Sequence, residues 1–143
     1  MRIQYNAIDL RITTWMQKHG INLLRYTLAL VFMWFGALKL SGVSPAQELV
    51  TNTVYWFSPT WVVPFLGCWE ILIGICFLIQ KMHRVAIGLM TLQMIGTFLP
   101  LFLLPEKVYG TIPLLTLTLE GQYIIKNLVL LAAAIVVGST VRK

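Results

Sequence analysis

The sequence contains four apolar runs, each about as long as the ~20-residue helix that crosses a lipid bilayer. They cover residues 21–40, 62–80, 85–104 and 120–138. The segments between them carry residues that form turns or begin helices, as in SGVSP, FSPT, QKMHR and LPEKVYG. Hydrophobic residues make up 58% of the chain and charged residues 11%. These are too few charged residues to cover the surface of a soluble domain of this size. We therefore predict an all-α membrane protein, a four-transmembrane-helix bundle that forms a single domain over residues 1–143.

A short amphipathic helix is expected before the first span. The apolar residues Ile8, Ile12, Trp15 and Met16 recur at helical spacing, which is typical of a helix lying in the membrane interface. We expect this helix to end near Gly20, because glycine commonly terminates helices. No A-x-A-like cleavage site follows, so the segment is not interpreted as a signal peptide.

Two further local features follow from proline. Ser44, Pro45 and Gln47 match the first positions of a capped helix, so we expect a short outer helix between spans one and two. Pro100 lies within the third span, where it cannot continue the helical hydrogen bonding. We expect a kink there, which either packs tightly or lines a wet cavity.

The positions of lysine and arginine predict how the spans are oriented. Basic residues precede the first span, occupy the second connection and end the chain: Arg2, Arg11, Lys18, Lys81, Arg84, Arg142 and Lys143. In the first and third connections, Lys107 is the one basic residue that clearly lies in a loop, and these connections also contain Glu48 and Glu106. Because segments rich in lysine and arginine stay in the cytoplasm, we expect both termini and the second connection to be cytoplasmic.

The pattern of residues argues against several other classes of protein. The net charge is +6, yet the basic residues are scattered singly between apolar runs, unlike the basic stripe of a nucleic-acid-binding surface. Cys68 and Cys76 lie eight residues apart on one predicted helix, roughly 12 Å at 1.5 Å per residue, which is too far for a disulfide. His19 and His83 are interpreted as solvated residues. Two distant histidines without an acid–histidine cluster offer no coordination set, so no metal site is predicted.

Four ionisable residues within the apolar runs constrain the function most. They are Lys39, Glu70, Glu120 and Lys126. At 1.5 Å per residue, Glu70 lies roughly 13 Å below the outer boundary and Lys126 roughly 9 Å deeper than Glu120, so all four fall in the outer half of the membrane. We expect one polar cluster that binds a ligand or exchanges protons. The expected supporting residues are Gln93, Gln122, Tyr123 and Asn127.

Glu70 is the most informative of the four. A carboxylate in hydrocarbon must be protonated, paired or hydrated, because its burial alone costs several kcal/mol. Gly67 and Gly74 flank it on the same helical face, and small residues allow another helix to approach closely. Two interpretations stay open: Glu70 belongs to a functional site, or it only locks helices together through a lysine or the Gln93 amide.

The basic residues of the spans also have a structural interpretation. Lys39 and Lys126 could extend their long side chains to the outer headgroups. Arg25, near the inner end of the first span, could reach the cytoplasmic headgroups in the same way. At 100° per residue, Arg25, Gly36 and Lys39 share one side of that span.

Several stretches of the sequence resemble a known family. They are RYTLALVFMWFGALKL, PFLGCWEILIGICFL, QMIGTFLPLFLLPE and LTLEGQYIIKNLVLLAAAIVVG, which cover nearly the whole chain from about residue 25 to 138. They look like the YkgB/RclC-type bacterial inner-membrane proteins, which are similar to the DoxX-like group of small four-helix membrane proteins. The E-G-Q-Y-x-x-K-N stretch at 120–127 is the most specific part, and the outer connections are shorter than in some members.

The resemblance implies a multi-pass protein of the bacterial inner membrane. Some relatives are linked with oxidative-stress defence, and some DoxX-like members are subunits of quinone-linked oxidoreductases. The family's motif residues correspond here to Lys39, Glu70, Glu120 and Lys126.

Three functions are compatible with these features. The first is a redox accessory subunit that binds a quinone or small polar ligand at the outer Lys/Glu cluster. The second is a non-catalytic scaffold whose glycine and alanine faces, including Gly67 and Gly74, recruit a partner membrane subunit. Assembly into a homo-oligomer also stays open. The third, a small transporter, is less favoured because the sequence lacks an inverted repeat. An autonomous enzyme is disfavoured because the chain has no nucleophile–base pair and no cofactor fingerprint.

Overall fold

The computed structural model describes residues 2–112 and 115–140. Four of its helical stretches are long and apolar enough to cross a membrane: Ala7–Leu40, Pro59–Leu78, Gln80–Leu103 and Leu119–Gly138. The C-terminal end of each stretch lies within a few residues of the end predicted from the sequence. The predicted all-α four-helix membrane bundle is confirmed. Arg142 and Lys143, which entered the predicted orientation, lie outside the described residues.

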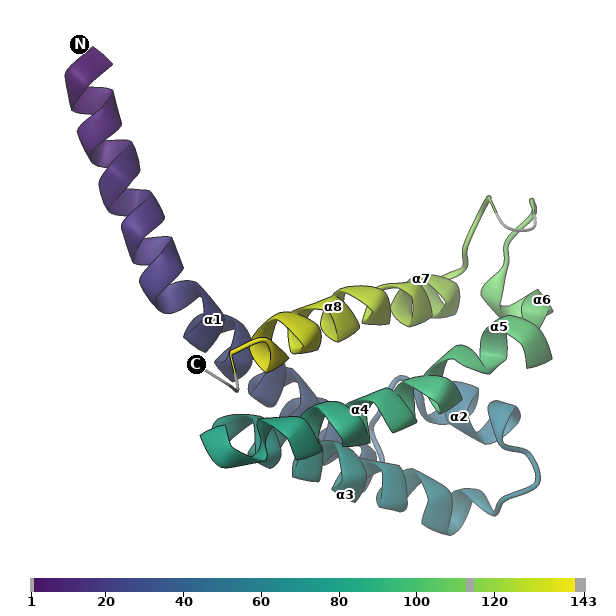
Figure 1. Cartoon of the computed structure of the whole chain (residues 1–143). Helices are drawn as coiled ribbons and strands as arrows, with labels where there is room; N and C mark the ends of the chain where they lie inside the picture. The colour runs from purple at the N-terminus through teal and green to yellow at the C-terminus, as the bar shows by residue number, and fades with distance from the viewer. Residues whose placement is uncertain (1, 113–114, 141–143) are drawn as a thin grey trace.

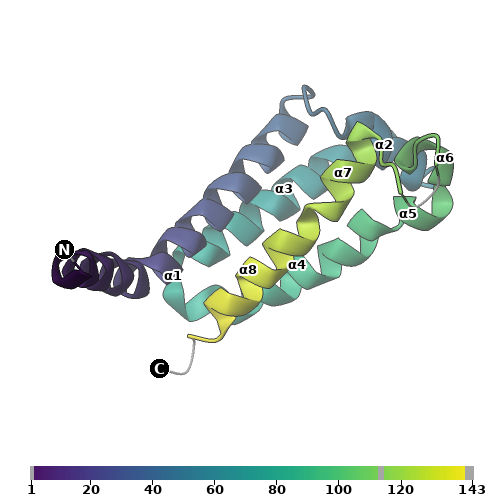
Figure 2. The same ribbon diagram turned by 90° about the horizontal axis from the view of Figure 1, so that it is seen from above.

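The helices follow one another along the chain in a simple up-and-down order. They are α1 (Arg2–Leu40), α2 (Gln47–Thr53), α3 (Pro59–Leu78), the 3-10 turn η1 (Gln80–Met82), α4 (His83–Phe98), α5 (Pro100–Leu103), α6 (Pro105–Val108), α7 (Leu119–Ile125) and α8 (Asn127–Gly138). Figure 2 shows the second half of α1 running alongside α3, α4 and α8, with α2, α5 and α6 gathered at one end of the bundle.

Helix α1 is continuous through Gly20, so the predicted helix end at that residue is wrong. Gly20 is followed directly by an apolar helix-forming run, whereas the glycine with a left-handed backbone is Gly42, with φ of 73°. The Val43 amide there donates to the Leu38 carbonyl at 3.2 Å, the hydrogen bond of a helix-terminating Schellman motif. Figure 1 shows the N-terminal half of α1 leaving the bundle.

The connection between α1 and α3 contains the predicted short helix. Helix α2 begins at Gln47 rather than Pro45, because the preceding residues form a turn. In that turn the Gln47 amide donates to the Ser44 carbonyl at 3.1 Å, and the Ala46 amide donates to Ser44 Oγ at 3.3 Å. Pro100 separates α4 from α5, as expected of a residue without an amide hydrogen.

The core of the bundle consists of small and aliphatic side chains from all four spans, with two phenylalanines. The buried residues are Leu28, Ala29, Phe32, Ile73, Cys76, Phe77, Ala86, Met90, Met94, Ala134 and Val137. His83 is also buried, with 5% of its surface exposed. The prediction that it is solvated was wrong because the second connection is very short, so His83 already begins α4.

Candidate functional site

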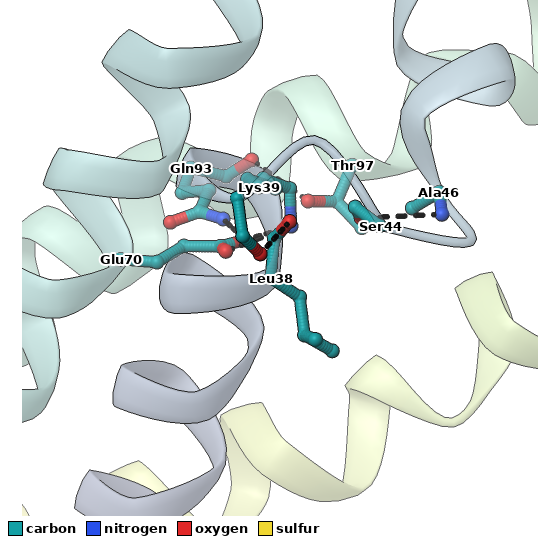
Figure 3. Close-up of polar contacts among 8 residues, drawn as sticks. Leu38, Lys39, Ser44, Ala46, Glu70, Gln93 and Thr97 are labelled. Atoms are coloured by element: carbon teal, nitrogen blue, oxygen red, sulfur yellow. Dashed lines mark hydrogen bonds and ion pairs between the residues drawn. The ribbon is translucent and has the colours of Figure 1, made fainter.

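A buried ion pair joins α1 to α3 near the end of the bundle that carries α2. Lys39 Nζ donates to Glu70 Oε1 at 3.0 Å and to Glu70 Oε2 at 2.7 Å. Gln93 on α4 donates from Nε2 to Glu70 Oε1 at 2.7 Å. Lys39 and Glu70 are only 8% and 7% exposed. Figure 3 shows the three side chains converging from their three helices.

Glycines bring the two charged residues within reach of each other. Gly36 lies three residues before Lys39, and Gly67 lies three residues before Glu70. A Cβ atom added to Gly36 would stand 2.5 Å from the Gly67 carbonyl oxygen, and one added to Gly67 would stand 2.8 Å from the Gly36 carbonyl oxygen. The backbones of α1 and α3 are therefore in direct contact one turn away from the ion pair. Gly74 extends this contact along α3, against Met33 and Ala29.

The electrostatic balance of the pair depends on its hydrogen bonds. Removing an ion from water costs several kcal/mol even after relaxation, and the mutual attraction repays this only with good geometry and further hydrogen bonds. The Glu70 carboxylate receives three such bonds, two from Lys39 and one from Gln93. The amide nitrogen of Gln93 must face Glu70, because the reversed amide would place two acceptors against each other.

The group retains unused hydrogen-bonding capacity. Gln93 Oε1 is buried and has no hydrogen-bond partner in the described part of the chain, a situation that costs about 1–3 kcal/mol. The Lys39 ammonium has three N–H donors, and both of its hydrogen bonds within the described residues go to Glu70. The site therefore offers one acceptor and one donor to a small polar molecule.

The other two predicted cluster residues lie elsewhere. Glu120 and Lys126 are exposed, and no ion pair or hydrogen bond among the described residues connects either of them to Glu70. Lys126 Nζ instead stands over the rings of Tyr123 at 4.0 Å and Phe35 at 5.6 Å. A common depth in the membrane is one coordinate only, and contact also depends on how each helix is rotated about its axis.

The remaining predicted supporting residues form bonds within their own segment. Gln122 Nε2 donates to the Leu117 carbonyl at 3.4 Å, and Asn127 Nδ2 donates to the Tyr123 carbonyl at 3.0 Å. Of the supporting residues, Gln93 is the one in contact with Glu70.

The E-G-Q stretch has a structural explanation that the sequence reasoning missed. A Cβ atom added to Gly121 would clash with the Val108 carbonyl oxygen, so the start of α7 lies directly against the end of α6. Thr118 fixes this contact: its hydroxyl donates to the Lys107 carbonyl at 2.6 Å and accepts from the Gly121 amide at 3.1 Å. The available signal was a threonine placed just before an apolar helical run, which is a typical N-cap.

Comparisons with known proteins assign no function to this site. No protein-family model, curated protein or solved structure matches the chain. Within residues 2–112 and 115–140, no group of three or more His, Cys, Asp or Glu side chains is placed to hold a metal ion. The polar group of Lys39, Glu70 and Gln93, hereafter the ion-pair site, is the candidate functional site.

Proposed function

We propose that this multi-pass membrane protein is an accessory subunit of membrane redox or oxidative-stress chemistry, of the DoxX-like type, and that the ion-pair site binds a quinone headgroup or another small polar ligand. The observation that carries the proposal is the buried Gln93 Oε1, which has no hydrogen-bond partner among the described residues and lies beside a desolvated ion pair. A group that served only to lock helices together would gain stability by satisfying that atom.

The chemistry of a quinone matches the free donor and acceptor. A quinone carbonyl would accept a hydrogen bond from the Lys39 ammonium, and a quinol hydroxyl would donate to Gln93 Oε1. Glu70, held beside both, is placed to exchange a proton with the bound headgroup. Because Oε1 is covered in the chain as it stands, the Gln93 side chain must shift to admit the ligand.

The proposal includes an orientation. With the basic second connection in the cytoplasm, the ion-pair site lies in the outer leaflet of a bacterial inner membrane and both termini are cytoplasmic. A quinone would then enter from the outer leaflet, where α2 and α5 flank the site.

The test is to purify the protein in mild detergent and to identify bound quinone by mass spectrometry of the extracted material. We expect quinone in the native protein and a loss of quinone in Glu70→Gln, which keeps a hydrogen-bonding side chain but removes the charge. Glu48→Gln is the matched control, because it removes a carboxylate from an exposed ion pair. In that pair Lys107 Nζ lies 2.9 Å from Glu48 Oε1. Equal quinone content in native and Glu70→Gln protein, both folded, refutes the proposal.

The scaffold alternative is supported by a different aspect of the same contacts. The ion-pair site ties α1, α3 and α4 together, which is what a purely structural role requires. The glycine face expected to recruit a partner, however, is covered by α1 of the same chain. Recruitment would therefore have to use other, lipid-facing surfaces, and co-purification of a partner with Glu70→Gln protein as efficiently as with native protein would favour it. The transporter alternative has no supporting contact among the residues that the structure describes, and ion flux through liposomes containing the pure protein would revive it.

A further inference from the structure

Two buried nitrogen-bearing side chains lie at the end of the bundle opposite the ion-pair site. Arg25 precedes Lys39 by 14 residues on α1, roughly 21 Å along the helix. His83 is the first residue of α4. Figure 1 shows the start of α4 and the end of α8 at the same end of the bundle. Arg25 and His83 are 6% and 5% exposed, and the Arg25 charge is close enough to act on the His83 imidazole.

Each of the two side chains carries one nitrogen that the described residues leave without a partner. Arg25 Nε and His83 Nε2 are both buried without a hydrogen-bond partner in the described part of the chain. The ion pairs found among the described residues join Lys39 to Glu70 and Lys107 to Glu48, so Arg25 has no carboxylate partner there. The guanidinium carbon lies 4.6 Å from the centre of the Tyr26 ring. The face of the ring attracts the cation, but it provides no hydrogen-bond acceptor in the plane of the guanidinium.

No acidic side chain in the described part of the chain is placed to neutralise Arg25. The chain has five acidic residues, and Glu48 and Glu70 are already paired. Glu106 and Glu120 belong to α6 and α7 at the other end of the bundle. Asp9 is 16 residues away on the part of α1 that leaves the bundle, roughly 24 Å along the helix. A buried cation without a counter-charge is strongly destabilising, so the site favours an anion beyond those that the described residues provide.

We propose that Arg25 and His83 bind the phosphate of an anionic phospholipid headgroup. The planar guanidinium presents paired N–H donors that match phosphate oxygens. The other ring nitrogen of His83 bonds the Phe77 backbone, so the imidazole supplies a further donor at Nε2 in its imidazolium form, in which both ring nitrogens donate. Lys81 and Arg84 flank His83 and are exposed, so the approach to the site is positively charged. Basic pockets between membrane helices are known to hold anionic headgroups, and the surrounding apolar surface favours a lipid over free phosphate.

The test uses the full chain in nanodiscs of phosphatidylcholine with and without phosphatidylglycerol, with retained lipids counted by native mass spectrometry. The native protein should retain phosphatidylglycerol selectively. Arg25→Gln should reduce this preference roughly tenfold, the effect of one lost charge-assisted hydrogen bond. His83→Asn is the second variant, in case Arg25→Gln does not fold.

Arg84→Gln is the matched control, because it removes the same charge from an exposed neighbouring position. Unspecific attraction between the basic end and anionic lipid would weaken equally in Arg84→Gln and Arg25→Gln, and that result overturns the site. Unchanged lipid preference in both Arg25→Gln and His83→Asn overturns it as well. Inorganic phosphate added to pure phosphatidylcholine discs distinguishes the sources: stabilisation that depends on Arg25 there would assign the site to free phosphate rather than to lipid.

Discussion

Lys39 and Glu70 each lose nearly all of their hydration in the bundle, and each is tolerable only because the other is present. A buried pair of this kind contributes little net stability compared with apolar residues of similar volume, whereas one unpaired member is costly. Replacing one charge and replacing both should therefore affect folding very differently, so stability measurements can test the pairing independently of ligand binding.

Glu70→Leu should therefore destabilise the protein by about 3–5 kcal/mol, because it leaves the Lys39 ammonium buried without its partner. The double variant Lys39→Met with Glu70→Leu should recover most of that loss, since no charge stays buried. Chemical unfolding in detergent micelles, followed by circular dichroism, measures both. A double variant as unstable as Glu70→Leu alone would contradict the pairing.

The ion pair of Glu48 and Lys107, unlike that of Lys39 and Glu70, is exposed to solvent. The hydrogen bond and charge of Lys107 hold the pKa of Glu48 below its ordinary value of 4.5. Since the folded-state pKa is lowered, the pair stabilises the contact between α2 and α6 above the ordinary pKa, and this contribution is lost as the pH falls through the lowered value.

The Glu48 titration can be followed by NMR of its side-chain carboxyl carbon. Lys107→Met should raise the pKa of Glu48 toward its ordinary value, because the largest cause of the lowering is removed. Asn52 also contributes a hydrogen bond that lowers the pKa, so a small part of the lowering should persist. An unchanged titration in Lys107→Met would show that the two side chains are not paired in solution.

At the scale of elements, the four spans were predictable because length and hydropathy decide whether a helix can cross a bilayer. The boundary at Gly20 was not, since a glycine ends a helix only where the chain can turn into the left-handed conformation, as it does at Gly42. The burial of His83 was missed for a related reason. The length of a turn, which sequence patterns define poorly, decides whether the next residue is in a loop or in the core.

The contact between α1 and α3 is the element-scale feature on which the ion-pair site depends. Gly36→Ala should destabilise the protein by about 1–3 kcal/mol, because the added methyl group would push the two backbones apart. Gly88→Ala is the matched control within α4. A Cβ atom there meets nothing within 4 Å, so the change should be neutral or stabilising by up to about 1 kcal/mol through helix propensity. Thermal unfolding of both variants in the same detergent tests the comparison, and equal effects would exclude close packing as the cause.

For the whole molecule, the sequence could place Lys39, Glu70, Glu120 and Lys126 at similar depths but could not say which of them meet. Depth follows from counting residues along a helix, whereas contact also requires the rotation of each helix about its axis. That rotation is set by packing, in particular by Gly36 and Gly67 for α1 and α3 and by Gly121 for α7. Those glycines are visible in the sequence, but their partners are not.

The arrangement of the bundle also makes a prediction about sidedness. Helix α3 has 20 residues, about 30 Å at 1.5 Å per residue, enough to cross the hydrocarbon core. The segments before and after it should therefore lie on opposite surfaces. In a background where Cys68 and Cys76 are replaced by alanine, a cysteine introduced by Lys81→Cys should be labelled by a membrane-impermeant thiol reagent only from the cytoplasmic side, and one introduced by Glu48→Cys only from the other. Labelling of both from one side would mean that α3 does not span the bilayer, and the buried ion pair would then need a different explanation from the one that a membrane interior provides.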